Sequence, residues 1–196
     1  MALDQYALTT REVVHSHRIA NGERLNTTPE TNNLIDNLIN AVSARFESYC
    51  DRKFKSRDYT EYQDGKGLDV LYPKQYPITS VSGIYDDSNW EWGAATLVSG
   101  TEYRIKNDNC VVFKSSASAL GDYSQNVKIV YTGGYSTIPY DLENACVNEV
   151  LRALGKIENL ELEEKRSNEY LLKYITNSFL KETRMTLDRY RRKVAW

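Results

Sequence analysis

The hydrophobic period of this chain changes twice along its length, and this change limits the folds that the chain can adopt. Apolar residues recur every three or four positions up to about Phe54 and again from Pro139, which is the spacing of helices that bury one face. Between Tyr59 and Tyr135 the pattern alternates and is interrupted by glycine and asparagine turns, which is typical of strands. The sequence therefore predicts an α+β fold, in which N- and C-terminal helices form a helical bundle and a strand-rich insertion of antiparallel hairpins lies between them in the sequence.

Two helices are expected in the N-terminal part. Thr9 and Glu12 have capping-box spacing, which favours a short helix opening at Thr9. Thr28 suits an N-cap and Pro29 the first position of a longer helix over residues 28–53. Its apolar stripe consists of Ile35, Leu38, Ile39, Val42, Phe46 and Tyr49. The opposite face is expected to be exposed to solvent and consists of Asp36, Asn37, Asn40, Ser43 and Glu47.

The middle part, residues 57–135, is expected to hold two hairpins and two further strands. Strands at 59–63 and 68–72 flank Asp64-Gly65-Lys66-Gly67, and strands at 103–105 and 110–113 flank Asn107-Asp108-Asn109. The further strands are expected at 78–85 and from residue 127, where Val127, Ile129 and Tyr131 alternate with two less buried positions. Residues 86–92 are expected to form an exposed loop.

The C-terminal part returns to helical spacing. Pro139 suits the start of a helix over residues 139–155, closed by Gly155. Its stripe consists of Leu142, Ala145, Cys146, Val150, Ala153 and Leu154. A second helix is expected over residues 160–180. Residues 181–196 carry six basic and two acidic side chains, a formal charge of +4, and form a basic tail that ends in Trp196.

Composition excludes several classes of protein. A length of 196 residues fits one domain, with or without an arm. The formal net charge of −2 gives no general attraction to nucleic acid or to an anionic membrane. Cys50, Cys110 and Cys146 lie far apart, which favours reduced, buried thiols and a cytoplasmic setting. No secretory signal or membrane-spanning stretch is recognised, so no membrane association is expected.

No arrangement of residues supports catalysis, a metal site or a cofactor. His15 and His17 would point about 200° apart on a helix and could not hold one metal ion. The glycine-rich phosphate loops and the serine nucleophile elbow are absent from the sequence. The acidic pairs Asp86-Asp87 and Glu163-Glu164 are better explained as solvated surface charge. The sequence therefore predicts a protein that is not an enzyme.

Two groups of residues are candidates for binding other proteins. Trp90 and Trp92 could pack within the chain or against a neighbouring copy, or could stack on a sugar, and we favour packing. The basic tail could be a frayed end or could dock on a partner, and its mixture of arginine and aromatic residues favours docking. The docking candidates are Arg189, Tyr190, Arg191, Arg192 and Trp196, and further interface candidates are Tyr170 and Tyr174.

The order of these pieces is more specific than any one of them. The helix that ends in residues 43–54, the Asp64-Gly65 turn and Pro77-Ile78-Thr79-Ser80-Val81 come first. Val130-Tyr131-Thr132-Gly133-Gly134-Tyr135 and Ile138-Pro139-Tyr140-Asp141-Leu142 follow. In this order, over roughly residues 31–154, the chain resembles the head-tail adaptor proteins of tailed bacteriophages, also called connector or head-completion proteins.

The resemblance implies a structural virion protein of the phage neck, made in the host cytoplasm. It implies a ring of copies, dodecameric in this family, which docks on the portal protein and links it to a further neck or tail-completion protein. DNA would pass through the channel without sequence-specific binding. Residues 28–180 would be the adaptor domain and residues 1–27 an N-terminal extension. Gly133, Gly134 and Pro139 would form the pivot at which the chain leaves the sheet and returns to the helices.

Two other functions remain as alternatives. A carbohydrate-binding or recognition module would use Trp90 and Trp92. A hydrolase would use Asp86 or Asp87, although no motif places a matching acid or base beside them.

Overall fold

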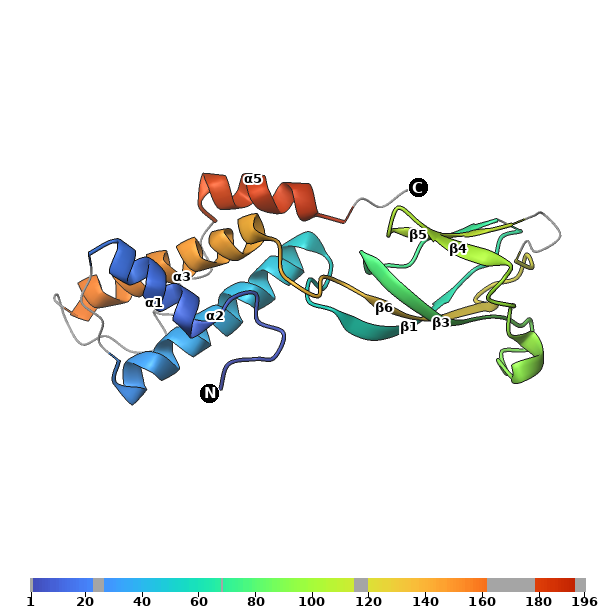
Figure 1. The fold of residues 1–196 in the computed structure, drawn as a ribbon, viewed down its shortest axis with the longest axis horizontal. Helices are drawn as coiled ribbons and strands as arrows, with labels where there is room; N and C mark the ends of the chain where they lie inside the picture. Colours follow the sequence, from blue (N-terminus) through green and yellow to red (C-terminus); the bar gives the residue numbers. More distant parts are fainter. Residues whose placement is uncertain (1, 23–26, 68, 115–119, 162–178, 193–196) are drawn as a thin grey trace. The chain divides into compact units, whose positions relative to one another are not determined.

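The chain forms two compact units. The computed structural model describes residues 2–22, 27–67, 69–114, 120–161 and 179–192, with the side chains of 158–161 excepted. The helical unit comprises Met1–Arg52 and Thr137–Trp196, and the sheet unit comprises Lys53–Ser136 (Figure 1). The α+β fold, with antiparallel sheets inserted between N- and C-terminal helices that pack together, is confirmed.

The helical unit consists of α1 (Arg11–Ala20), α2 (Pro29–Cys50), α3 (Tyr140–Glu161) and α5 (Lys181–Tyr190). Helices α2 and α3 pack against each other, and α1 and α5 each contact both of them. The unit is therefore built from helices at both ends of the sequence.

Helix α2 begins as the sequence predicts. Thr28 is the N-cap, its Oγ1 accepts the Thr31 N–H at 3.3 Å, and Pro29 is the first residue. Asp51 ends the helix with a left-handed backbone, φ +51°. Five members of the apolar stripe are buried, and Tyr49 is half-buried. The stripe is therefore confirmed as the main packing face of this helix.

The opposite face of α2 is a correction to the sequence prediction. Asn37 is exposed as expected, but Asp36, Ser43 and Glu47 are buried. Asp36 pairs with Arg11 of α1, and Ser43 Oγ accepts the Leu8 N–H at 3.1 Å. The half-buried Asn40 bonds the backbone of Asp4 and Ala2. The residues before α2 thus cover a face that the sequence pattern assigns to solvent.

The short first helix begins one residue later than predicted. Thr10 is the N-cap of α1, and its Oγ1 accepts the Val13 N–H at 3.5 Å. Thr9 is buried and its hydroxyl donates to Glu143 Oε1 at 3.3 Å. Thr9 therefore contacts α3 instead of capping α1.

Helix α3 begins at Tyr140, directly after Pro139, and continues through Gly155 to Glu161. The prediction that Gly155 closes this helix is wrong. Gly155 does not adopt a positive φ, and a Cβ added there would meet open space, so it continues the helix as an ordinary residue. Leu142, Ala145, Cys146, Val150 and Leu154 of the predicted stripe are buried. The second predicted helix, 160–180, lies almost wholly outside the described residues.

The sheet unit contains two antiparallel three-stranded sheets. One has the order β1 (Arg57–Gln63), β6 (Val127–Gly133), β3 (Ile78–Asp86), and the other β2 (Val70–Leu71), β5 (Cys110–Phe113), β4 (Tyr103–Lys106). The predicted burial of Val127, Ile129 and Tyr131 is confirmed, and these residues lie at the centre of the first sheet. They share one apolar core with Leu71, Val111 and Phe113 of the second sheet.

One predicted hairpin forms and the other does not. Strands β4 and β5 pair across a turn in which Asn107 and Asp108 have φ +52° and +55°. In contrast, β1 pairs with β6 and β2 pairs with β5, so the hairpin expected around Asp64-Gly65 is wrong. The Gly65 N–H donates to Asn126 Oδ1 at 2.8 Å, and this bond directs the connection from one sheet to the other.

Gly133, the last residue of β6, and Gly134 after it sit where no larger residue fits. Gly134 has φ +105°, and a Cβ there would lie 2.8 Å from the carbonyl oxygens of Phe54 and Lys55. At Gly133 a Cβ would lie 2.9 Å from the Tyr131 ring and 3.0 Å from Gln75 O. The strand therefore ends at a tightly packed turn that requires glycine.

Candidate assembly surfaces

Helix α5, within the predicted basic tail, is fastened to the helical unit. Leu187 and Thr183 are buried. Tyr49 Oη donates to Asp188 Oδ1 at 2.6 Å, and Cys50 Sγ donates to the Leu187 carbonyl at 3.5 Å. Residues 181–190 are therefore a packed helix with one apolar face, not a solvated, frayed end.

The buried carboxylate of Glu149 holds the beginning of α5. Its Oε1 accepts the Leu180 N–H at 2.7 Å, and its Oε2 accepts the Arg152 Nε–H at 3.0 Å. Leu180 is the N-cap of α5 and provides no side-chain cap, so Glu149 satisfies a backbone donor that the helix start exposes. A buried acidic side chain on α3 thus sets where α5 begins.

Four of the five predicted docking residues gather where α2 ends and α3 begins. Tyr190 Oη donates to Asp141 Oδ1 at 2.5 Å, and Arg189 approaches Asp141 Oδ2 at 3.4 Å. The Arg192 N–H donates to the Cys50 carbonyl at 2.9 Å. We call Arg189, Tyr190, Arg191 and Arg192 the C-terminal surface. The fifth candidate, Trp196, lies outside the described residues.

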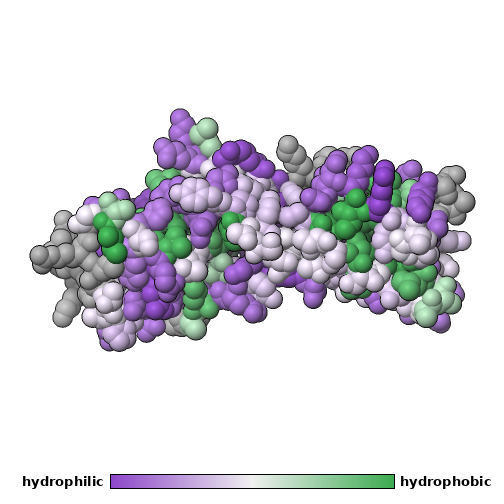
Figure 2. All heavy atoms as spheres, viewed as in Figure 1, coloured by the Kyte–Doolittle hydropathy of each residue, from purple (hydrophilic) through white to green (hydrophobic). Residues whose placement is uncertain are grey.

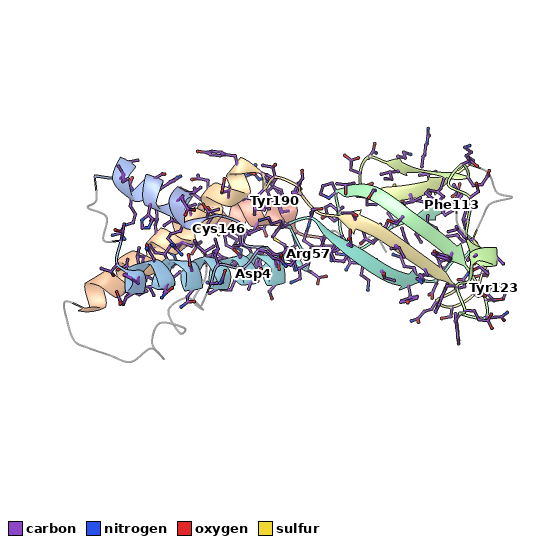
Figure 3. The ribbon with its side chains drawn as sticks, turned by 60° about the horizontal axis from the view of Figure 1, so that its bottom comes forward. Asp4, Arg57, Phe113, Tyr123, Cys146 and Tyr190 are labelled. Atoms are coloured by element: carbon purple, nitrogen blue, oxygen red, sulfur yellow. The ribbon has the colours of Figure 1, made fainter. Side chains whose placement is uncertain are left out.

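The C-terminal surface presents cationic groups on a fixed backbone. The side chain of Arg189 is 66% exposed, and Arg191 is exposed with its guanidinium 5.8 Å from the centre of the Tyr49 ring. Figure 3 labels Tyr190 within the helical unit. An arrangement of arginine and tyrosine on a rigid support is typical of residues that dominate protein interfaces.

The two tryptophans of the sheet unit have different environments. Trp90 is 56% exposed, and its Nε1–H donates to the Ser124 carbonyl at 3.2 Å. Trp92 is half-buried, with its ring centre 4.8 Å from that of Tyr62. Trp92 thus packs within the chain, whereas Trp90 keeps a free face. The other interface candidates, Tyr170 and Tyr174, lie outside the described residues.

The loop that carries both tryptophans is organised by Asp87. This buried carboxylate accepts the backbone N–H groups of Asn89, Glu91 and Trp92 at 2.8 to 3.2 Å. Asp86 accepts the Gly121 N–H at 2.8 Å. The prediction that this pair is solvated surface charge is wrong for Asp87, which is buried, while Asp86 is half-buried. Both carboxylates accept backbone N–H groups, which supports a structural role and gives no support to a hydrolase. Glu163 and Glu164 lie outside the described residues.

The cysteines are free and buried, as the sequence predicts. Burial raises the pKa of Cys50 to about 11 and that of Cys146 to about 12. Within the part of the chain that the structure describes, no three His, Cys, Asp or Glu residues could hold a metal ion. No helix among the described residues is both long and apolar enough to cross a membrane.

Sequence reasoning misses the residues that fasten these surfaces. Glu149, Asp141 and Tyr49 hold α5, and Asn126 holds the loops of the sheet unit. Glu149 directly precedes Val150 of the predicted apolar stripe, and Asn126 directly precedes the alternating strand β6. A polar residue beside a buried position only weakly indicates such a structural role, because the groups that it bonds lie far away in the sequence.

Comparisons with known proteins agree with this fold. The model of the family described as "Head completion protein" matches residues 22–192. No curated protein is close enough in sequence to count as a relative. Among solved structures, a chain from "Neck of empty GTA particle computed with C6 symmetry" is similar with TM-score 0.61 and 14% identity, over 94% of this chain and 90% of that one.

Two further structures show the same fold. One is a chain from "Neck of native GTA particle computed with C12 symmetry", with TM-score 0.54 and 14% identity over 83% of this chain and 84% of that one. The other is from "Virion of native gene transfer agent (GTA) particle", with TM-score 0.56 and 17% identity over 100% of this chain and 95% of that one. Because the family model matches most of the chain, this protein belongs to the head completion protein family, whose members are structural and not enzymes.

Proposed function

We propose that this head completion protein is the head-tail adaptor of a phage-like neck. It forms a ring, dodecameric in this proposal, that docks on the portal and links it to the next neck or tail-completion protein. The family match supports the structural role, and the similar chains come from neck structures solved with C12 and C6 symmetry. The protein would be in the neck of the virion after assembly in the host cytoplasm.

The C-terminal surface is the observation that carries the portal-docking part of this proposal. Tyr190 is held by Asp141, and the backbone of Arg192 by the Cys50 carbonyl, so Arg189 and Arg191 are presented from a fixed backbone that loses little freedom on binding. Trp196 extends this set as a candidate anchor. The formal net charge of −2 is compatible with DNA passing through a ring without being held.

The remaining interface candidates are assigned to contacts between copies in the ring or to contacts with the next neck or tail-completion protein. Trp90 keeps a free aromatic face, and Tyr170 and Tyr174 stay candidates for contacts between copies. Gly133, Gly134 and Pro139 are proposed as the pivot between the sheet and helix α3, supported by the space restrictions at both glycines.

The test uses purified portal and electron microscopy. Truncation after Arg192 removes Trp196 and disturbs no described contact, and Arg191→Glu reverses one exposed charge of the C-terminal surface. Both changes should abolish ring density on the portal. Lys181→Glu, at the exposed start of α5, is the matched control and should leave the ring in place. Normal rings from both altered proteins would refute the docking role.

A further inference from the structure

Three loops meet at one end of the first sheet. Gln63 of β1 and Asp86 of β3 both lie opposite Val127 of β6, so β1 and β3 end where β6 begins. Tyr62 lies near the end of β1, Trp90 and Trp92 follow β3, and Tyr123 precedes β6. We call these four residues the aromatic end. Figure 3 labels Tyr123 at this end of the sheet unit and Arg57 at the other end of the same sheet.

The aromatic end is exposed. Trp90 is 56% and Tyr123 61% exposed, and Tyr62 is also exposed. In the view of Figure 2, apolar residues of the sheet unit lie among hydrophilic ones, so its surface mixes both kinds. Exposed tryptophan and tyrosine side chains that lie close together mark binding sites more often than single apolar residues do.

The loops of the aromatic end are rigidly connected to one another. The fully buried Asn126 accepts the Gly65 N–H at 2.8 Å and donates to the Gly121 carbonyl at 3.0 Å. Asp64 Oδ1 accepts the Gln125 N–H at 2.8 Å. Trp90 and Trp92 are held at φ +61° and +44°, which non-glycine residues rarely adopt. The rings are therefore presented on a fixed support.

The charge around these rings is acidic. Residues 62–67, 86–92 and 121–128 contain five carboxylates and two lysines, a formal net charge of −3. Asp64, Glu91 and Asp122 are exposed. Lys128 already lies over two rings, with its Nζ 5.0 Å from the centre of Tyr85 and 6.0 Å from that of Trp92. One ring of the aromatic end, Trp92, therefore already faces a cation.

We propose that the aromatic end binds an arginine-bearing segment of a partner protein. Guanidinium groups stack on tryptophan and tyrosine faces and pair with carboxylates, and this end offers both on a fixed support. The occupant's positive charge complements the acidic rim. The inference rests on the proposed adaptor function, and it assigns the chemistry of a protein that the adaptor meets.

The test is a titration of the full chain followed by nuclear magnetic resonance of the tryptophan indole N–H signals. The probe is a short peptide in which arginine alternates with glycine, and its matched control carries neutral citrulline in place of arginine. The arginine peptide should shift the Trp90 signal, with weaker binding at higher salt. The Trp196 signal serves as an internal reference and should not move.

Substitutions locate the binding. Trp90→Ala, followed through the Trp92 signal, and Tyr123→Ala, followed through the Trp90 signal, should each weaken binding by about fivefold or more. Tyr140→Ala, which removes an exposed aromatic ring from the helical unit, is the control and should leave it unchanged. Equal binding of the citrulline peptide, or no shift of Trp90, would overturn the proposal. A Trp90 shift with a malto-oligosaccharide but not with the arginine peptide would also overturn it, in favour of glycan binding.

The outcome separates this inference from the proposed function. Tyr123→Ala should still form rings on the portal, because Tyr123 belongs neither to the C-terminal surface nor to the candidates for contacts between copies. If the protein forms normal rings on the portal but does not bind the arginine peptide, only the inference about the aromatic end is refuted. Peptide binding by a chain that never attaches to portal removes the adaptor function and leaves an arginine-binding surface.

Discussion

The helical unit and the sheet unit use buried polar residues in different ways. In the helical unit, Asp36 and Glu149 join outer segments of the chain to the central helices α2 and α3. In the sheet unit, Asn126 and Asp87 hold loops while the core remains apolar. The buried carboxylates of the helical unit fix the positions of whole helices. The buried polar residues of the sheet unit fix the conformation of the loops at one end of its first sheet. In each unit, buried polar groups thus support the surface that we assign to binding.

The largest expected effect is confined to the sheet unit. A Cβ at Gly65 would lie 2.0 Å from the Gly121 carbonyl oxygen, so Gly65→Ala must displace backbone. We expect destabilisation of about 4 kcal/mol or more, at the upper end of single-substitution effects. Hydrogen exchange should show faster exchange in β1, β3 and β6 and unchanged protection in α2.

Gly100→Ala is the matched control, because nothing lies within 4 Å of the added methyl group and its φ is not positive. It should be nearly neutral. Equal behaviour of the two variants would contradict the close approach of the loops at Gly65.

The next effect concerns the attachment of α5. Leu187 is fully buried, and Leu187→Ala should cost about 3 kcal/mol through lost burial and a residual cavity. Met185 of the same helix is 62% exposed, so Met185→Ala should change little. Exchange rates of the amides in residues 181–190 measure the difference. Similar rates in the two variants would show that α5 does not pack through Leu187.

A smaller effect is expected at Glu149. Glu149→Gln keeps an acceptor for the Leu180 N–H but removes the charge that faces Arg152, and should destabilise the start of α5 by about 1 to 2 kcal/mol. Glu182→Gln on the exposed side is the control. Thermal unfolding followed by circular dichroism measures both. A neutral Glu149→Gln would mean that the charge of this buried group contributes nothing.

The effect that is smallest at neutral pH is a pH dependence within the helical unit. Burial raises the pKa of Cys146 from 9 to about 12, so the folded state favours the neutral thiol. Its contribution is fully present below pH 9 and is lost as pH rises toward 12. The wild type should therefore lose stability between these values more steeply than Cys146→Ala. Equal slopes in urea unfolding would contradict a buried thiol at this position.

Sequence patterns predict the features of this molecule that depend on neighbouring residues. The start of α2 at Thr28-Pro29 and the β4–β5 turn depend on neighbouring residues, and both are predicted correctly. The β1–β2 hairpin fails because β1 pairs with β6, and Gly65 bonds a residue 61 positions away. Asp36 and Ser43 look solvated because their partners, Arg11 and Leu8, lie 25 and 35 positions earlier in the chain. Long-range partners of polar residues leave no periodic signal.

The candidate site follows the same rule. Arginine and aromatic residues at the C-terminus can be recognised from composition, which is why the sequence alone makes Arg189, Tyr190, Arg191 and Arg192 candidates. Their contacts with Asp141 at the start of α3 and with Cys50 at the end of α2 bring together residues far apart in the sequence, and residue spacing does not predict them. The tryptophans of the aromatic end can likewise be recognised in the sequence. The segment with Tyr123 and Asn126 is brought to them by long-range hydrogen bonds, such as that from Trp90 to Ser124, which the sequence does not reveal.

A structure of the adaptor bound to portal, determined by cryo-electron microscopy, tests the central assignment of the two surfaces. We predict a ring whose contacts with portal come from the C-terminal surface, residues 189–192, and from Trp196. The aromatic end should be free of portal in the same ring. Portal contacts made by Trp90 and Tyr123, with Arg189 and Arg191 free in solvent, would contradict this assignment.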